Sequence, residues 1–139
     1  MRARYFLEQY SKLNKMIANK EKEAAELRAA ATGTTSRFGT ERVQTSGNPD
    51  KMADAIDKYV TLEKEITADI DRLIDIKKDI IAVLEQLNAK QYELLYTRYV
   101  DDLPLKAIAG QKKCSYDSIR AAHRRAIKSV QRILDERNI

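Results

Sequence analysis

Basic side chains gather on one face of the segment 115–135. When this segment is drawn as a helix, Arg and Lys residues spread over half of its circumference, at positions 120, 124, 125, 128 and 132. An arginine can bond two acceptors on guanine, and both cations attract phosphates. Solvated helices usually mix both signs of charge, yet the stretch from Leu103 to Leu134 carries eight basic residues and one acid, Asp117. We therefore expect this face to bind the major groove of double-stranded DNA.

The opposite face of the same segment is apolar. It carries Ile119, His123, Ala126, Val130 and Ile133. Because no Ser or Cys nucleophile shares this face, we interpret His123 as a partly buried structural imidazole rather than a catalytic base. Cys114, which precedes the segment, is interpreted as a small buried hydrophobe.

The elements that would position the basic segment lie directly before it. Asn88, with Gln91 three residues on, has the pattern of a capping box and predicts a third helix that ends at Asp101-Asp102. A short helix from Pro104 to about Gln111 follows, then a tight turn over 112–114, and Ser115 caps the basic segment. This order is typical of a helix-turn-helix. The residues of the short helix that we expect to face inward are Leu105, Ile108 and Ala109.

Two long helices are expected in the first 87 residues. Apolar residues at spacings of three, four and seven predict helices over 3–30 and 50–87, about 42 and 57 Å long. Asn48-Pro49-Asp50 has the composition of a helix start, and residues 31–49 that of a linker. The apolar residues are Tyr5, Phe6, Tyr10, Leu13, Ile17, Ala24 and Leu27 in the first helix, and Met52, Ile56, Tyr59, Ile66, Ile70, Leu73, Ile80, Leu84 and Leu87 in the second.

The predicted fold is all-α, with a long N-terminal helical hairpin, coiled-coil-like, over 1–87 and a helix-turn-helix domain over 88–139. A long rod cannot bury its apolar stripe alone, so the second helix needs the first helix, another copy, or both. We expect the hairpin to serve homo-oligomerisation, with a dimer favoured. The pattern leaves open whether the two helices pair within one chain or between chains.

Composition narrows the class of protein. The chain has 139 residues and a formal charge of +5, and its single cysteine excludes an internal disulfide and a cysteine-cluster zinc site. One cysteine fits a reducing cytoplasm. The first residues, MRARYFLEQY, lack the apolar core of a signal peptide, and no apolar run approaches the 20 or so residues that cross a bilayer. We expect a protein without a membrane partner.

One group of carboxylates has a regular spacing. Asp71, Asp75 and Asp79 repeat every four residues, no His accompanies them, and several cations lie among them. We interpret them as a solvated acidic face rather than as a metal or acid–base site. There is also no Gly-rich phosphate loop. The sequence therefore predicts a protein that is not an enzyme and that uses no cofactor or metal.

The segment from Leu94 to Val130 resembles region four of bacterial sigma factors, and more closely the RinA and ArpU type of phage transcriptional regulators. The resemblance covers about a third of the chain. Its elements are an Arg-Tyr pair, an acidic link, an Ile-Ala helix, a turn that ends in Ser, and a helix with a β-branched residue, a His and an Ala-aliphatic pair. They correspond here to Arg98-Tyr99, Asp101-Asp102, Ile108-Ala109, Ser115, Ile119, His123 and Ala126-Ile127.

The resemblance implies which residues would contact DNA. It places base-reading positions at Tyr116, Asp117, Arg120 and Ala121, with Arg124 close by. Two residues depart from the pattern, since Lys112 replaces an aliphatic residue and Lys113 replaces the Gly or Asn of the turn. Both add a cation near the expected DNA backbone. The full predicted DNA-binding set is Lys112, Lys113, Ser115, Tyr116, Asp117, Arg120, Ala121, Arg124, Arg125 and Lys128.

Three functions remain open on the sequence. The first is a sequence-specific phage transcription regulator, an activator of late genes, that binds promoter DNA and contacts host RNA polymerase. The second is a small terminase-like DNA-packaging subunit that forms rings. The third is a coiled-coil interaction protein whose basic end binds RNA or an acidic protein. The resemblance favours the first.

Overall fold

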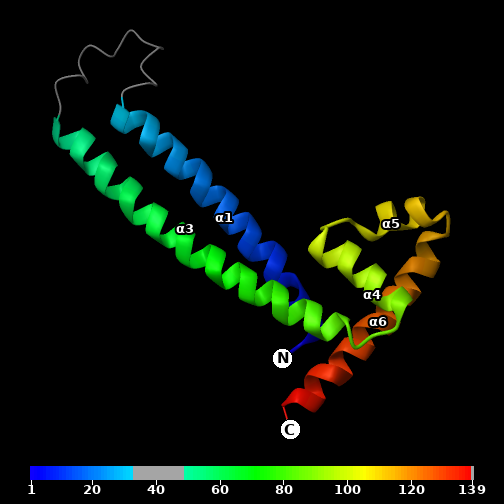
Figure 1. Cartoon of the computed structure of the whole chain (residues 1–139). Helices are drawn as coiled ribbons and strands as arrows, with labels where there is room; N and C mark the ends of the chain where they lie inside the picture. Colours follow the sequence, from blue (N-terminus) through cyan, green and yellow to red (C-terminus); the bar gives the residue numbers. More distant parts are fainter. Residues whose placement is uncertain (33–48, 139) are drawn as a thin grey trace. The chain divides into compact units, whose positions relative to one another are not determined.

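The computed structural model describes residues 1–32 and 49–138, and all regular structure in these ranges is helical (Figure 1). This confirms the all-α prediction. Within these ranges, no helix combines the length and the apolar character needed to cross a membrane. The helices are α1 (Ala3–Thr32), α3 (Pro49–Leu84), α4 (Ala89–Leu95), the π-helical turn η2 (Tyr96–Val100), α5 (Leu105–Lys112) and α6 (Tyr116–Arg137).

The chain divides into two compact units, which we call the terminal unit and the middle unit. The terminal unit combines Met1–Asn14 with Leu73–Ile139, and the middle unit is Lys15–Arg72. This division does not coincide with the predicted boundary after residue 87. Most of the predicted linker, including the expected cap Asn48, lies outside the described residues, whereas Pro49 opens α3 as expected.

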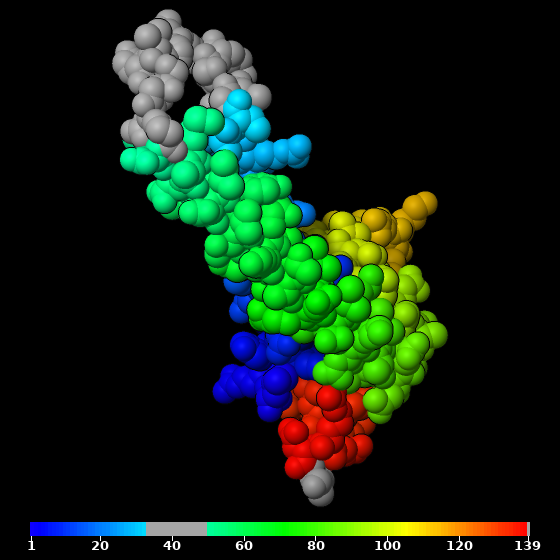
Figure 2. Space-filling model, turned by 60° about the vertical axis from the view of Figure 1, so that its left-hand side comes forward, coloured from blue at the N-terminus to red at the C-terminus, as the bar shows by residue number. Residues whose placement is uncertain are grey.

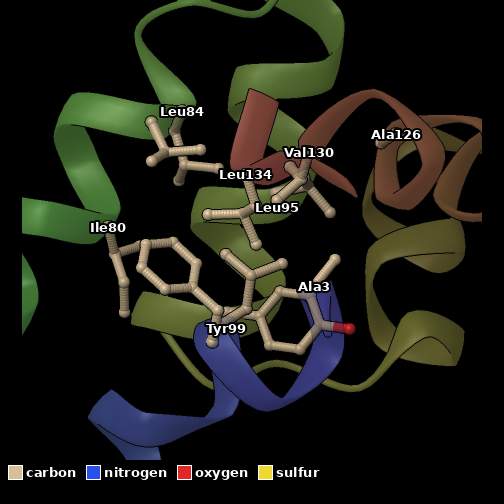
Figure 3. Close-up of a cluster of buried hydrophobic side chains, with 11 residues drawn as sticks. Ala3, Ile80, Leu84, Leu95, Tyr99, Ala126, Val130 and Leu134 are labelled. Atoms are coloured by element: carbon tan, nitrogen blue, oxygen red, sulfur yellow. The ribbon is translucent and has the colours of Figure 1, made fainter. Parts of the chain in front are cut away.

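The main core of the terminal unit joins both ends of the chain. The first turns of α1 contribute Ala3, Phe6 and Leu7, and in the space-filling view this blue segment lies against the red end of α6 (Figure 2). Apolar side chains from α1, α3, α4, η2 and α6 meet in one cluster (Figure 3). The cluster also holds Ile80, Val83, Leu84, Leu95, Tyr99, Ala126, Val130 and Leu134.

Tyr5 was expected on the apolar face of the first helix, and this expectation is wrong. The Tyr5 side chain is 56% exposed, and the Lys12 ammonium lies 5.7 Å from its ring centre. The buried face passes through Ala3, Phe6 and Leu7. At 100° per residue, Tyr5 points about 160° away from the direction of Leu7 and away from that face.

The middle unit holds two helical segments that run in opposite directions, one from α1 and one from α3 (Figure 1). An ion pair joins them, because the Lys20 ammonium lies 2.7 Å from a carboxylate oxygen of Asp69 and 3.3 Å from one of Glu65. Asp69 is 5% exposed and also pairs with Arg72 at 3.1 Å. The hydrogen bond from Lys20 lowers the pKa of Asp69, and the same bond raises the pKa of Lys20.

The third predicted helix is present but changes its form half-way. The Asn88 side chain accepts a hydrogen bond from the Gln91 N–H at 2.9 Å, as its spacing predicted. After Leu95 the helix widens into η2, in which the Asp101 N–H donates to the Tyr96 carbonyl at 3.1 Å. The helix ends at Val100, and Asp102 then takes a left-handed conformation with φ of 60°.

Candidate nucleic-acid interface

The turn between α5 and α6 is a Schellman motif. The Lys113 N–H donates to the Gly110 carbonyl at 3.3 Å, and the Cys114 N–H donates to the Ala109 carbonyl at 3.1 Å. Lys113 lies in the left-handed region, with φ of 54° and ψ of 44°. Glycine is the usual residue there because a side chain adds a steric penalty of roughly 1 kcal/mol. The turn therefore keeps its left-handed conformation although a lysine occupies the position.

Ser115 starts α6 as an N-cap. Its side chain accepts a hydrogen bond from the Ser118 N–H at 3.0 Å, which satisfies one of the unpaired donors at the helix start. The Ser115 hydroxyl also donates to the Ser118 hydroxyl at 2.9 Å. The predicted cap is confirmed, because the Ser115 hydroxyl bonds a backbone N–H in the first turn of α6.

A second apolar cluster fixes α5 against α6. Ile108 and Ala109 are buried as predicted, and Leu105 packs against them at the edge of the cluster. Ile119 comes from the first turn of α6 and Leu94 from α4. These contacts tie the basic helix to two elements, so its exposed face has a fixed orientation within the terminal unit.

His123 is held inside the terminal unit, as predicted. It is 5% exposed, and its Nε2 shares a hydrogen bond of 2.7 Å with the Tyr99 hydroxyl. Burial, together with the smaller effect of the nearby charges of Arg4 and Arg98, lowers the pKa of His123 from 6.5 to about 4. Burial also raises the pKa of Tyr99. The imidazole is therefore neutral at physiological pH and takes part in a buried polar pair.

The outer face of α6 carries the predicted cations at the surface. Arg120, Arg124, Arg125, Lys128 and Arg132 are all exposed. Arg120 is partly held in place, since it lies 3.6 Å from Asp117 and 5.5 Å from the ring centre of Tyr116. Among the described residues, the other four cations make no ion pair with a carboxylate, so their charge is not neutralised within the part of the chain that the structure covers.

The remaining predicted residues occupy different surroundings. The Lys112 ammonium forms an ion pair with Glu93 at 3.0 Å and so links α5 to α4. Lys113 is exposed, and Tyr116 is 41% exposed. Ala121 is half-buried on the side of α6.

One cation beside this face was not among the predicted residues. Lys106, from α5, places its ammonium 5.5 Å from the ring centre of Tyr116, so two cations, Lys106 and Arg120, lie near this exposed ring. The sequence signal for Lys106 was its place in the basic stretch after Leu103. Only the packing of α5 on α6 brings it to the Tyr116 ring.

The prediction that Cys114 is buried is wrong. The Cys114 side chain is exposed. The Schellman motif uses the backbone of Cys114 to reach the Ala109 carbonyl, and the thiol lies on the outer side of the turn.

Comparison of the chain with protein-family models, curated proteins and solved structures finds no match. Within residues 1–32 and 49–138, no three side chains of His, Cys, Asp or Glu are grouped as they would be to hold a metal ion. Asp71, Asp75 and Asp79 are each exposed. The exposed cations of α6 are therefore the candidate site that the described residues offer.

Proposed function

We propose that the chain is a sequence-specific DNA-binding protein that reads the major groove with the first turns of α6. One observation carries this proposal: Arg124, Arg125 and Lys128 are exposed, without an ion-pair partner among the described residues, on a helix that a capped turn orients. Three unpaired cations on one helix face are unfavourable unless an anion approaches them. A polyanion with a groove that admits a helix supplies that anion.

The role that we propose is that of a phage transcription regulator acting in a bacterial cytoplasm. The resemblance of 94–130 to the promoter-reading region of sigma factors supports a promoter as the target. One such motif makes few contacts, and non-specific binding alone is only about 10⁻⁴–10⁻⁶ M at physiological salt. Two linked readers bind more tightly through effective concentration. Their half-sites would lie about 10 base pairs apart, or a multiple of that spacing.

The proposed regulator self-associates through α3. Within the middle unit, Met52, Ile56, Val60 and Ile70 are 39–47% exposed, which is unusual for apolar residues that recur on one helix face. The spacing of Val60, Glu63, Thr67 and Ile70 is symmetric about residue 65.

That symmetry favours a second copy of the chain in the antiparallel direction. A two-fold axis at residue 65 sets Val60 opposite Ile70 of the second copy, and Glu63 opposite its Thr67. A parallel pair in register would instead place two Glu63 carboxylates against each other. Charge therefore selects the antiparallel arrangement.

The DNA-binding proposal is tested by selecting bound sequences from random duplexes and then measuring the affinity of variants. We expect Arg120→Ala to weaken specific binding by about 1–3 kcal/mol and to relax preference at one base pair, because it removes a bidentate contact. Lys128→Ala should weaken binding to all sequences and reduce the salt slope by about one unit.

Arg137→Ala is the matched control for these variants. Arg137 also lies on α6, but it pairs with Asp79 at 3.2 Å. It should leave DNA affinity unchanged. Parent-like binding by both Arg120→Ala and Arg124→Ala would contradict the proposed face.

The regulatory role is tested by genome-wide footprinting in infected or lysogenic cells, followed by transcription with purified polymerase. Binding just upstream of a late operon, with a change in transcript level, supports the regulator. Binding confined to a packaging site, with a ring-shaped oligomer and no effect on transcription, would identify the terminase-like alternative. Binding to RNA or to an acidic protein in place of duplex DNA would identify the interaction protein.

A further inference from the structure

We propose that Arg2 and Arg4 form a phosphate-binding extension of the α6 surface, so that the first residues of the chain contact the DNA backbone beside the groove that α6 reads. This inference rests on the proposed DNA-binding function. It adds a contact from the opposite end of the sequence, which neither the basic stretch nor the helix-turn-helix pattern indicates.

Two hydrogen bonds tether this N-terminal segment to α6. The Ala3 N–H donates to Gln131 Oε1 at 2.8 Å, and Gln131 Nε2 donates to the Met1 carbonyl at 3.0 Å. The side chain of Ala3 is 2% exposed and belongs to the core that includes Val130. The backbone of residues 1–3 is therefore fixed on α6, and the arginines on either side of Ala3 have a defined place.

Gln131, to which the N-terminal segment is bonded, lies next to the basic face of α6. Gln131 follows Arg124 by seven residues and Lys128 by three, so the three side chains lie on neighbouring parts of the same helix surface. A surface depression beside it is lined by Arg2, Arg4 and Tyr5 of the N-terminal segment and by Ile127 and Gln131 of α6. The Gln131 amide also donates to Asp135 at 3.0 Å, and this acid marks the far limit of the basic surface.

The charges in this region are available to an anion. Arg2 and Arg4 are exposed, and no carboxylate of residues 1–32 or 49–138 forms an ion pair with either of them. The first turn of α1 holds no acidic residue. The nearest acidic side chain on the rim of the depression is Glu8, which is half-buried and one turn further along α1.

The distance from Arg120 to Gln131 along α6 exceeds the width of the major groove. Eleven residues separate Arg120 from Gln131, which is about 16 Å along a helix. The major groove is about 12 Å wide. When the first turns of α6 contact bases, Gln131 and the tethered segment therefore lie beyond the groove, at the level of the sugar-phosphate backbone. Arginines in that place meet phosphates rather than base edges.

The experiment compares the full chain with the double variant Arg2→Ala/Arg4→Ala on its selected DNA and on random duplex. We expect weaker binding to both DNAs by the same factor, and a salt slope shallower by about one unit for each arginine removed. The variant Arg2→Lys/Arg4→Lys should restore most of the affinity, because a phosphate contact needs charge more than geometry.

Two further variants distinguish a phosphate contact by Arg2 and Arg4 from a general effect of lowering the positive charge. Lys15→Ala/Lys22→Ala removes the same charge from exposed positions elsewhere on α1 and should leave the salt slope unchanged. Gln131→Ala removes the tether and should reproduce part of the loss seen with the arginine pair. Parent-like affinity and slope in Arg2→Ala/Arg4→Ala, with loss of binding in Arg124→Ala, would overturn this inference alone. Absence of DNA binding by the parent chain would overturn the proposed function and this inference together.

Discussion

At the scale of single residues, the terminal unit contains a buried polar pair that joins η2 to α6. Tyr99 and His123 are 4% and 5% exposed, and the ring planes stack at a centroid distance of 5.7 Å. The neutral imidazole can either donate to or accept from the Tyr99 hydroxyl. A protonated imidazole would be charged, buried and close to two arginines, so protonation opposes the folded state.

We expect acid to destabilise the protein through His123. Above pH 6.5 the imidazole is neutral in both folded and unfolded chains, and pH has no effect through this group. Below pH 6.5 and down to the folded pKa of about 4, only the unfolded chain binds the proton. The free energy of unfolding therefore falls by about 1.4 kcal/mol per pH unit in this window.

Urea unfolding of the parent and of His123→Gln at pH 7 and pH 5 measures this effect. The glutamine keeps a polar atom near the Tyr99 hydroxyl but does not titrate. Between the two pH values, the parent should lose about 2 kcal/mol more than the variant. Carboxylate titrations, such as that of Asp69, are common to both chains and cancel in the comparison. An identical loss in both chains would contradict the assignment.

At the scale of elements, Lys113 in the turn before α6 has a charge that suits DNA binding and a backbone conformation that suits glycine. Lys113 provides an exposed cation beside the basic helix, yet its φ of 54° favours glycine. If Lys113 contacts a phosphate, its replacement by glycine will raise the stability of the fold and lower the affinity for DNA.

We expect Lys113→Gly to raise the free energy of unfolding by up to about 1 kcal/mol, because glycine relieves the left-handed conformation. The same variant should weaken DNA binding and make its salt slope shallower. Thermal unfolding and a salt titration of binding measure the two effects. Lys112→Gly is the control, since Lys112 is helical and paired with Glu93, and it should lower stability by about 1 kcal/mol. A decrease in stability for Lys113→Gly would show that the turn is not strained.

At the scale of the whole molecule, the proposed reader needs a second copy, and the open apolar stripe of α3 is the surface that we assign to it. Met16 on α1 is also 49% exposed within the middle unit, so this unit presents apolar area from both of its helical segments. Assembly and DNA reading use different residues and can be separated by mutation.

Ile70→Asp should shift the chain from dimer to monomer. The new carboxylate would lie opposite Val60 of the second copy, and an unpaired buried charge costs several kcal/mol, which raises the dissociation constant by about two orders of magnitude or more. Sedimentation at tens of micromolar measures this change, and the helical content should stay constant. Thr61→Asp adds the same charge at an exposed position outside the stripe and should leave the dimer intact. A monomeric parent at these concentrations would refute the assembly proposal.

The local features of this protein could be predicted from its sequence. The caps at Asn88 and Ser115, the start of α3 at Pro49 and the buried and exposed faces of α6 follow from residues within a few positions of one another. Helix periodicity and capping act over one or two turns, so a single sequence contains their full signal.

Contacts between residues far apart in the sequence could not be predicted and are seen only in the folded chain. The tether from Ala3 to Gln131 spans 128 residues, and no local pattern indicates it. Tyr5 matched the apolar spacing yet is exposed, because the face that packs on α6 is set by Ala3 and Phe6. Cys114 is apolar yet exposed, because the turn uses its backbone. Packing between segments far apart in sequence fixes these outcomes, and burial depends on the partner surface as much as on the residue.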